Sequence, residues 1–286
     1  MGKGRKSKTG KGGTRQPPPE EPADGGGWKA TRTWIAGVLS AVLVAAVGVV
    51  FTNWFTSRGT DAIDRISGTP PVTIGHVAVD EEERNIVLRE PVTDPKERGI
   101  LLGRATAEER AALLNRHHAS LTDRMNVTVV LVGNRTSLRI VDIKPRVLVR
   151  KARSDGAFLQ KGTAGEAETV ELGADLDQQA PRFTTSDDPD VRYFSKKQID
   201  LKRDERVTLS LEIRGRKAYY EFDLLATVLA GDRTEQIVIN GPGGSPFRLT
   251  GEATSFRSVY TEAPGGAWAP VPAATVCVMF PKTAGC

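Results

Sequence analysis

Three histidines are the residues in this sequence best suited to bind a metal ion. His117 and His118 are adjacent, and His76 lies far from them along the chain. Consecutive residues of a helix point about 100° apart, so this pair cannot hold one ion without help from other segments. No Asp, Glu or Cys stands at ligand spacing on the same helix face. We therefore predict structural or surface roles for all three histidines, and no metal site.

Aspartates are the second group with chemical potential, and five of them fall in predicted loops: Asp175, Asp177, Asp187, Asp188 and Asp190. Oxygen-rich loops at one end of a β-sandwich can bind calcium. The spacing of these residues matches no calcium-binding loop, and Arg182 and Arg192 lie among them. We expect solvated loops here, with calcium binding as the alternative.

Glycines at residues 241–245, in the sequence Gly-Pro-Gly-Gly-Ser, resemble part of a phosphate-binding loop. The lysine and the following helix of such a loop are missing, so the pattern predicts a turn. The chain has no Gly-x-Ser-x-Gly motif, and no local pattern indicates a nucleophile. The sequence therefore favours a protein that is not an enzyme and needs no cofactor. An enzyme whose site is dispersed over several loops is the alternative.

Segment 34–55 has the features of a transmembrane helix. Its first 18 residues carry no charge. As a helix, the whole segment would be roughly 33 Å long, enough for a hydrocarbon core of about 30 Å. Trp34 lies at one end, and Trp54 and Phe55 lie at the other, as in an interfacial aromatic belt. A cleaved signal peptide fits less well, because a long segment precedes the run and bulky residues follow it. We predict an uncleaved signal anchor.

The net charge of +5 is concentrated in residues 1–33, and the remainder of the chain is neutral. This distribution gives no support for nucleic-acid binding. It predicts a cytoplasmic N-terminus and an extracytoplasmic C-terminal part, in a single-pass protein of the cell membrane. The tail is rich in Gly, Lys and Pro, a composition typical of disorder. Its charges either set topology alone or also contact anionic lipids, through Lys3, Arg5, Lys6, Lys8 and Lys11.

The C-terminal part changes to a period of two, with apolar side chains at alternate positions. The predicted strands cover residues 127–132, 138–143, 146–150, 169–172, 207–213, 220–229, 236–239 and 246–249. Gly231-Asp232 predicts a tight hairpin between two of them. This series of short strands without a long helix predicts a mainly β fold, an immunoglobulin-like antiparallel β-sandwich over residues 123–251. A β-barrel is the alternative.

Two segments flank the predicted sandwich. Residues 56–122 form a juxtamembrane segment with short strands predicted at 72–79 and 85–88. A capping box at Thr106 predicts the start of a short amphipathic helix over 107–121. Its apolar stripe would consist of Ala107, Ala111, Leu114, His118 and Leu121. Residues 252–286 are rich in Pro and Gly and contain one strand-like run, 275–280.

Cys277 and Cys286 are the only two cysteines of the chain. An exported domain lies in an oxidising environment, so a disulfide is chemically allowed. Closing a ring of this size would restrict the unfolded chain by roughly 2.7 kcal/mol in the entropic model. We expect an internal disulfide; an intermolecular bridge through Cys286 and two free thiols are the alternatives.

Three stretches carry a resemblance to other proteins. They are VTVVLVGNRTSLRIVDIKPRVLV, RVTLSLEIRGRKAYYEFDLLATVLAGDRTEQIVING and SPFRLTG, together with the preceding anchor. This combination resembles the exported domains of uncharacterised single-pass membrane proteins from actinobacteria. The resemblance covers roughly residues 123–251 and implies a β-sandwich. It carries over no catalytic residue.

These observations together predict a membrane-anchored protein whose exported β-sandwich acts as a binding or interaction module in the cell envelope. Its partners would be the lipid bilayer and either a protein or a cell-wall component, with no nucleic acid. Two alternatives are signal relay through the basic tail and an envelope enzyme with a dispersed site. β-Sandwiches recur as non-enzymatic modules, which favours the binding function.

Overall fold

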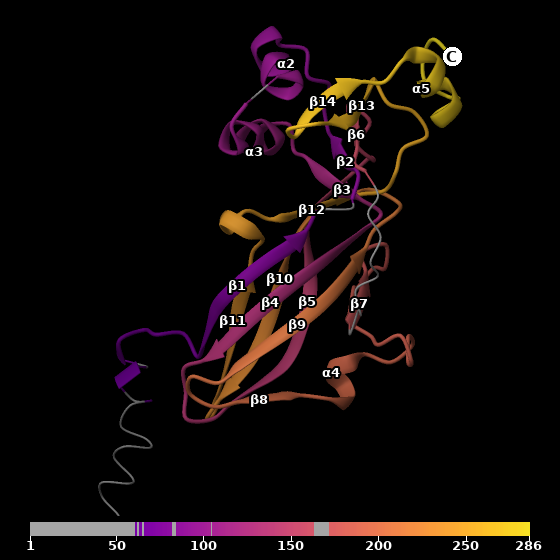
Figure 1. Ribbon diagram of the computed structural model, residues 1–286. Helices are drawn as coiled ribbons and strands as arrows, with labels where there is room; N and C mark the ends of the chain where they lie inside the picture. Colours follow the sequence, from indigo (N-terminus) through magenta and orange to yellow (C-terminus); the bar gives the residue numbers. More distant parts are fainter. Residues whose placement is uncertain (1–60, 62, 65, 82–83, 104, 163–171) are drawn as a thin grey trace, which may run out of the picture. The chain divides into compact units, whose positions relative to one another are not determined.

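The computed structural model describes residues 61–286, apart from residues 62, 65, 82–83, 104 and 163–171 (Figure 1). Within this described part, no helix is long and apolar enough to cross a membrane. The predicted tail and the predicted anchor lie outside the described residues, together with their candidate residues Lys3, Arg5, Lys6, Lys8, Lys11, Trp34, Trp54 and Phe55.

One layer of the fold is a four-stranded sheet in the order β1-β4-β9-β7. Its strands are β1 (Val72–Asp80), β4 (Arg124–Gly133), β7 (Leu172–Asp175) and β9 (Arg206–Arg214). The predicted alternation is confirmed in β4, where Val127, Val129 and Leu131 are buried. The intervening side chains are partly exposed on the other face. Alternate burial of this kind follows from the pleat of the strand.

The second sheet has ten strands in the order β14-β13-β6-β2-β3-β12-β10-β5-β8, with β11 paired to β10. The long ones are β5 (Leu138–Lys151), β10 (Tyr219–Ala230) and β11 (Arg233–Ile239). The shorter ones are β2 (Ile86–Leu88), β3 (Ser120–Thr122), β6 (Ala157–Gln160), β8 (Ile199–Leu201), β12 (Phe247–Thr250), β13 (Ser258–Ala263) and β14 (Ala267–Pro270).

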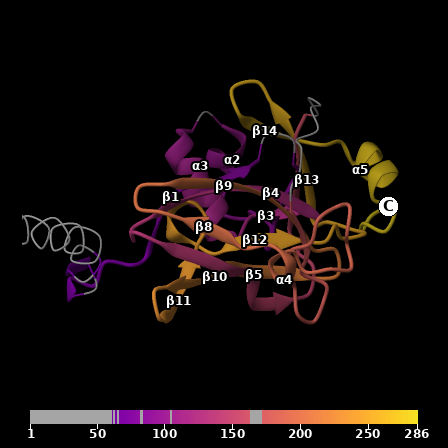
Figure 2. The ribbon, with the colours of Figure 1, turned by 90° about the horizontal axis from the view of Figure 1, so that it is seen from below.

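The four-stranded sheet and the long strands of the second sheet form two layers with the main core between them (Figure 2). We call β1, β4, β7 and β9 with β5, β8, β10, β11 and β12 the sandwich. Phe222 and Phe247 stack in this core with ring centroids 5.3 Å apart. Each large apolar side chain buried here contributes about 1.5–3 kcal/mol. The mainly β fold and its sandwich-like arrangement are as predicted. However, β7–β9, β12–β3 and β13–β6 pair in parallel rather than antiparallel.

The sandwich confirms the hairpin signal and changes one strand boundary. Ala230 pairs with Arg233 across the two-residue turn Gly231-Asp232, and Gly231 adopts φ +69°. The two strands predicted at 138–143 and 146–150 are one strand, β5, which continues through Pro145. Among the described residues, β5 beyond Ile140 pairs on one side only, with β10. A free sheet edge is where proline is tolerated.

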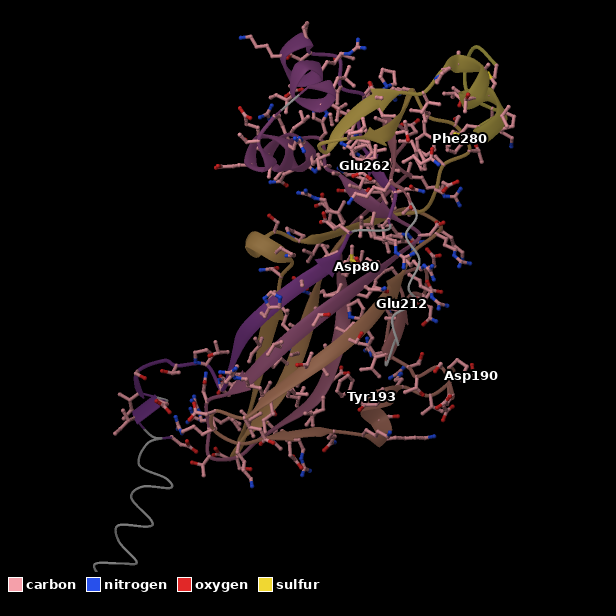
Figure 3. The ribbon with its side chains drawn as sticks, viewed as in Figure 1. Asp80, Asp190, Tyr193, Glu212, Glu262 and Phe280 are labelled. Carbon is pink, nitrogen blue, oxygen red and sulfur yellow. A yellow bond between two sulfur atoms is a disulfide. The ribbon has the colours of Figure 1, made fainter. Side chains whose placement is uncertain are left out.

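The remaining elements form a region that we call the small lobe. It comprises β2, β3, β6, β13 and β14 with the helices α2 (Pro95–Leu102), α3 (Ala107–Arg116) and α5 (Ala273–Met279). The ten-stranded sheet runs from the sandwich into this lobe where β12 pairs with β3. A second apolar cluster lies here, built around Phe158, Phe256 and Phe280, whose rings are 4.8–5.1 Å apart. Phe280 follows α5 directly (Figure 3).

Helix α3 begins as predicted and ends earlier. Thr106 and Glu109 form the capping box, with the Glu109 amide donating to Thr106 Oγ1 at 3.2 Å. The helix ends at Arg116 rather than at residue 121, because His118 takes a left-handed φ of +50° and Ser120–Thr122 pair as β3. The buried face centres on Leu113, and the predicted stripe residues Ala107 and Ala111 are exposed.

The strand predicted at 275–280 is wrong, because these residues lie mainly in helix α5. Pro272 precedes the helix, and Phe280 after it packs into the aromatic cluster. A short apolar run does not by itself distinguish a strand from a helix.

The boundaries predicted at 122/123 and 251/252 do not separate compact units. The described residues from 61 to 286 belong to one unit by their contacts. The flanking segment 56–122 supplies β1, β2 and β3 to the two sheets, and 252–286 supplies β13 and β14. These strands pair with strands from distant parts of the chain. Their pairing therefore produces no local sequence signal that would mark a domain boundary.

Candidate binding sites

The three histidines lie apart in the described structure. His117 Nε2 is 2.8 Å from Glu97 Oε2, which joins α3 to α2. The hydrogen bond with His117 and the neighbouring Arg116 keep the pKa of Glu97 below its usual range. His118 Nδ1 is 3.4 Å from Glu221 Oε1, and His76 is exposed on β1. In the described part of the chain, no three His, Cys, Asp or Glu residues are grouped so that they could hold a metal ion.

Of the aspartates predicted to lie in loops, Asp175 is instead the last residue of β7, and its Oδ1 accepts from the Asp177 amide at 2.8 Å. Asp177 accepts hydrogen bonds from the backbone amides of Arg216 and Lys217, both at 3.0 Å, and from the hydroxyl of Tyr220. Burial opposes ionisation of Asp177, but these three donors outweigh it and lower the pKa of the carboxyl. Asp177 therefore stabilises the connection between β9 and β10. Asp188 binds Lys196 Nζ at 2.8 Å, and Asp190 lies in the same outer loop (Figure 3).

The remaining predicted features are the glycine-rich turn and the cysteines. The Gly241 amide donates to the Ser245 carbonyl at 2.8 Å, so residues 241–245 form the predicted turn. Gly243 and Gly244 have φ values of +69° and +79°, which favour glycine. Cys277 and Cys286 are joined in the expected internal disulfide.

A groove lies where the small lobe meets the sandwich, with a volume of about 540 Å³. This size falls within the range of about 300–1,000 Å³ that is typical of ligand pockets. Its lining is largely apolar. One wall is helix α3, the opposite wall is the turn 241–245 with Phe247, and Ile86, Leu121 and Met125 also line it.

Part of the predicted apolar stripe lines this groove, although Leu121 in β3 also belongs to the buried core and Leu114 packs against that core. Ala111, Leu114 and Leu121 line the groove, whereas Ala107 does not. The walls carry short side chains, among them Ala111 and Ala112 opposite Gly243. The helical periodicity therefore predicted an apolar surface correctly, and part of this surface lines the groove. Short side chains on both walls leave room for a bulky group from outside.

Polar contacts hold the walls of the groove in place. Arg110 Nη2 donates to the Gly265 carbonyl at 3.3 Å and so ties α3 to the turn between β13 and β14. Arg248 on β12 lines the groove, and its Nη1 donates to Asn115 Oδ1 at 2.6 Å. These contacts fix helix α3 over the ten-stranded sheet.

Glu221 on β10 anchors Arg248 at the end of the groove. Its Oε1 lies 3.5 Å from Arg248 Nε and accepts a hydrogen bond from the Tyr219 hydroxyl at 2.6 Å. Burial opposes ionisation of Glu221, but the Tyr219 hydrogen bond and the charges of Arg248 and His118 outweigh it and lower the pKa of the carboxyl. Burial raises the pKa of Tyr219, helped by its hydrogen bond to Glu221. At neutral pH an ionised carboxylate therefore holds the guanidinium in place.

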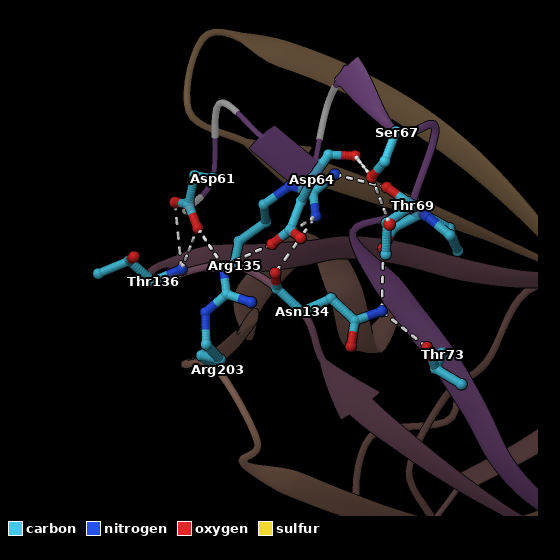
Figure 4. A network of polar contacts seen from close by, with 10 residues as sticks. Asp61, Asp64, Ser67, Thr69, Thr73, Asn134, Arg135, Thr136 and Arg203 are labelled. Carbon is cyan, nitrogen blue, oxygen red and sulfur yellow. Dashed lines mark hydrogen bonds and ion pairs between the residues drawn. The ribbon is translucent and has the colours of Figure 1, made fainter. Parts of the chain in front are cut away.

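A polar clamp lies at the opposite end of the sandwich, where the described chain begins (Figure 4). Arg203 Nη2 binds Asp61 Oδ1 and Asp64 Oδ2, both at 2.7 Å. Arg135 is only 2% exposed, and its Nη2 donates to the Thr69 carbonyl at 2.6 Å. Asn134 Nδ2 donates to Thr73 Oγ1 at 2.7 Å. The clamp fixes the point at which the chain enters the sandwich.

Sequence reasoning did not identify Arg248, Asn115 or Glu221. Arg248 and Glu221 are cross-strand neighbours of β12 and β10, which only the register reveals. Asn115 comes from a helix more than one hundred residues earlier in the chain. The available signal was the pair of opposite charges at alternating positions of two predicted strands, and it is too common to indicate a site.

Comparisons with protein-family models, with curated proteins and with solved structures found no match for this chain.

Proposed function

We propose that this chain is a single-pass membrane protein whose exported part is a binding module of the cell envelope. In this proposal, residues 34–55 anchor it, the N-terminus is cytoplasmic, and the sandwich is immunoglobulin-like, as in the actinobacterial proteins it resembles. The apolar groove beside α3 carries the proposal. It is a preformed concave surface with short apolar walls and a fixed polar end, the combination expected of a binding site.

The occupant that fits best is an apolar side chain of a partner protein. The walls of Ala111, Ala112 and Gly243 leave room for an aromatic or branched side chain. Arg248 and Asn115 at one end offer donors and an acceptor to the partner's backbone. Apolar anchors that fill a pocket dominate the energetics of protein interfaces.

A matched pair of variants tests this function. Ala111→Arg places a long charged side chain in the groove, whereas Ala107→Arg makes the same change on the same helix outside it. A biotinylating peroxidase fused to the C-terminus of the full chain would label neighbouring envelope proteins in the native host. We expect Ala111→Arg to lose a reproducible set of labelled proteins and Ala107→Arg to keep it.

Two outcomes would contradict the proposal. If both variants label the same proteins as the unmodified chain, the groove does not bind the partner. If labelling is confined to cytoplasmic proteins, the proposed orientation is inverted. Photo-crosslinking from position 111 but not from position 107 would identify the partner that enters the groove.

A further inference from the structure

A second concave site lies at the free edge of β5, apart from the groove. It is a cleft of about 350 Å³ between β5 and the loop that follows β7. Four cationic residues line it: Lys144, Arg146 and Arg150 on β5, and Arg182 on the facing loop. No Asp or Glu lines this cleft, although both residue types are common elsewhere in the described chain.

Only one of these four charges is neutralised in the described structure. Arg146 binds Asp223 through two hydrogen bonds, Nε to Oδ1 at 3.0 Å and Nη2 to Oδ2 at 2.6 Å. Within the described residues, Lys144, Arg150 and Arg182 form no salt bridge. Arg182 donates only to the Pro181 carbonyl, at 2.9 Å. Three of the four cationic residues that line the cleft therefore have no carboxylate partner among the described residues.

A β-bulge directs Arg150 into the cleft. The register between β5 and β10 shifts at Leu148, so that Arg150 pairs with Tyr220 on the face that points inward. The Arg150 guanidinium lies 5.5 Å from the centroid of the Tyr220 ring. Strict alternation would have placed Arg150 on the same face as Arg146 instead. Bulges are frequent where a side chain must be redirected next to a functional site.

Protection of a free sheet edge is the alternative explanation for these charges. Lysine, arginine and bulges on an edge strand prevent pairing with other chains. That role accounts for the cations on β5 itself. It does not require Arg182 or the amides of Gln178 and Gln179, which belong to the facing loop and line the same cleft. Arg150 on one wall and Arg182 on the other therefore favour an anionic ligand between them.

We propose that this cleft binds a phosphomonoester. Such a group carries about −1.5 to −2 charges at neutral pH and presents three strong acceptor oxygens. It therefore matches Arg150 and Arg182 better than a single carboxylate does, and Gln178 and Gln179 offer neutral amide donors. Arginine is suited to phosphate because its planar fork donates two parallel hydrogen bonds. The cleft exceeds the volume of a few water molecules, at about 30 Å³ each, so the organic part of the ester also fits.

Calorimetric titration with glycerol 3-phosphate tests the proposal. The full chain would be held in micelles of an uncharged sugar detergent, so that the only phosphate present is the added ester. We expect saturable binding and a loss of affinity of about tenfold or more in Arg150→Gln/Arg182→Gln. Acetate at the same ionic strength should bind far more weakly.

A control variant separates the cleft from general attraction to a basic chain. Arg98→Gln/Arg233→Gln removes the same charge from two exposed positions outside the cleft and should bind as the unmodified chain does. Circular dichroism must show that each variant is folded. If the double variant Arg150→Gln/Arg182→Gln does not fold, the single loop variant Arg182→Gln replaces it in the titration.

A second ligand distinguishes a lipid headgroup from a soluble phosphate ester. Vesicles with phosphatidic acid carry the monoester on a lipid, and a dependence on Arg150 and Arg182 seen only with these vesicles assigns a lipid headgroup. The same dependence with glycerol 3-phosphate assigns a soluble ester. The proposal is overturned if the control pair weakens binding equally, if acetate or polyglutamate binds as tightly, or if no saturable binding occurs.

Discussion

The sandwich and the small lobe reach stability in different ways. Five strands of the sandwich contain 9 to 14 residues and contribute side chains to one continuous core. The five strands of the small lobe contain 3 to 6 residues, and β13 pairs with β6 from about a hundred positions earlier. Such short strands form few ladder hydrogen bonds, and the lobe adds helices, an aromatic cluster and a disulfide to the apolar residues, such as Leu88 and Leu159, that it shares with the main core.

This contrast indicates different roles for the sandwich and the small lobe. The sandwich is a rigid support, because its core is continuous between the two sheets. The small lobe brings α3 against that support and so creates the groove. Sites formed where two regions meet can change when the weaker region loosens. We therefore expect changes in the lobe to affect the groove first, and changes in the sandwich to affect the whole described part of the chain.

The largest effect is expected in the sandwich core. Phe222 is fully buried and stacks on Phe247, so Phe222→Ala should lower the free energy of unfolding by about 3–5 kcal/mol. Urea unfolding followed by circular dichroism measures the change. Phe280→Ala in the small lobe is the matched comparison and should open the lobe while the sandwich keeps its structure. Equal loss of all strands in both variants would show that the two regions unfold as one unit.

The disulfide should contribute mainly to the small lobe. Replacing Cys277 and Cys286 by serine removes a ring closure worth about 2.7 kcal/mol in the entropic model. We expect faster amide hydrogen exchange in β13 and β14 and unchanged exchange in β4 and β9. Exchange that accelerates equally in the sandwich would contradict a separately stabilised lobe.

A smaller, pH-dependent effect is expected at the rim of the sandwich. Burial and the hydrogen bond to Asp177 raise the pKa of Tyr220 to about 12. A raised tyrosine pKa adds stability that is fully present below about pH 10 and is lost as the pH rises toward 12. The lowered pKa of Asp177 adds stability that is lost as the pH falls below about 4.

Tyr220→Phe tests this pair. The substitution removes one donor to an ionised carboxylate and should cost about 1.5 kcal/mol at neutral pH. It should also weaken the loss of stability on both the acid and the alkaline side, measured by urea midpoints from pH 3 to pH 11. Tyr193→Phe is the control, because Tyr193 forms no side-chain hydrogen bond among the described residues. Identical pH profiles for the parent chain and Tyr220→Phe would exclude the proposed coupling.

The smallest effect on stability is expected in the groove itself. Ala111 is exposed, and arginine is nearly as good a helix former as alanine, so Ala111→Arg should change the free energy of unfolding by less than about 0.5 kcal/mol. Thermal unfolding beside Ala107→Arg measures this. A large destabilisation would mean that position 111 packs against the fold, and the groove would then not be a preformed site.

Much of the sandwich could be predicted because its physical cause is local. Alternating apolar residues in β4, β9 and β10 require one buried face, and Gly231-Asp232 permits a two-residue turn. The capping box of α3 is equally local, since Thr106 and Glu109 lie three residues apart. The end of that helix was not predictable, because β3 forms only when β2 and β12 are beside it. Helix α5 was not predicted for a related reason, since Phe280, which follows it, packs against distant aromatic residues.

The sequence alone determined the mainly β character, the concentration of charge at the N-terminus, the helix start and the two cysteines able to pair. These properties depend on neighbouring residues or on composition. The tertiary structure decided which surfaces became sites. Helix α3 turned part of a predicted packing stripe into the wall of a groove, and a bulge at Leu148 moved Arg150 to the inner face beside Tyr220. Both outcomes depend on strand register and on contacts between distant segments, which no local pattern encodes.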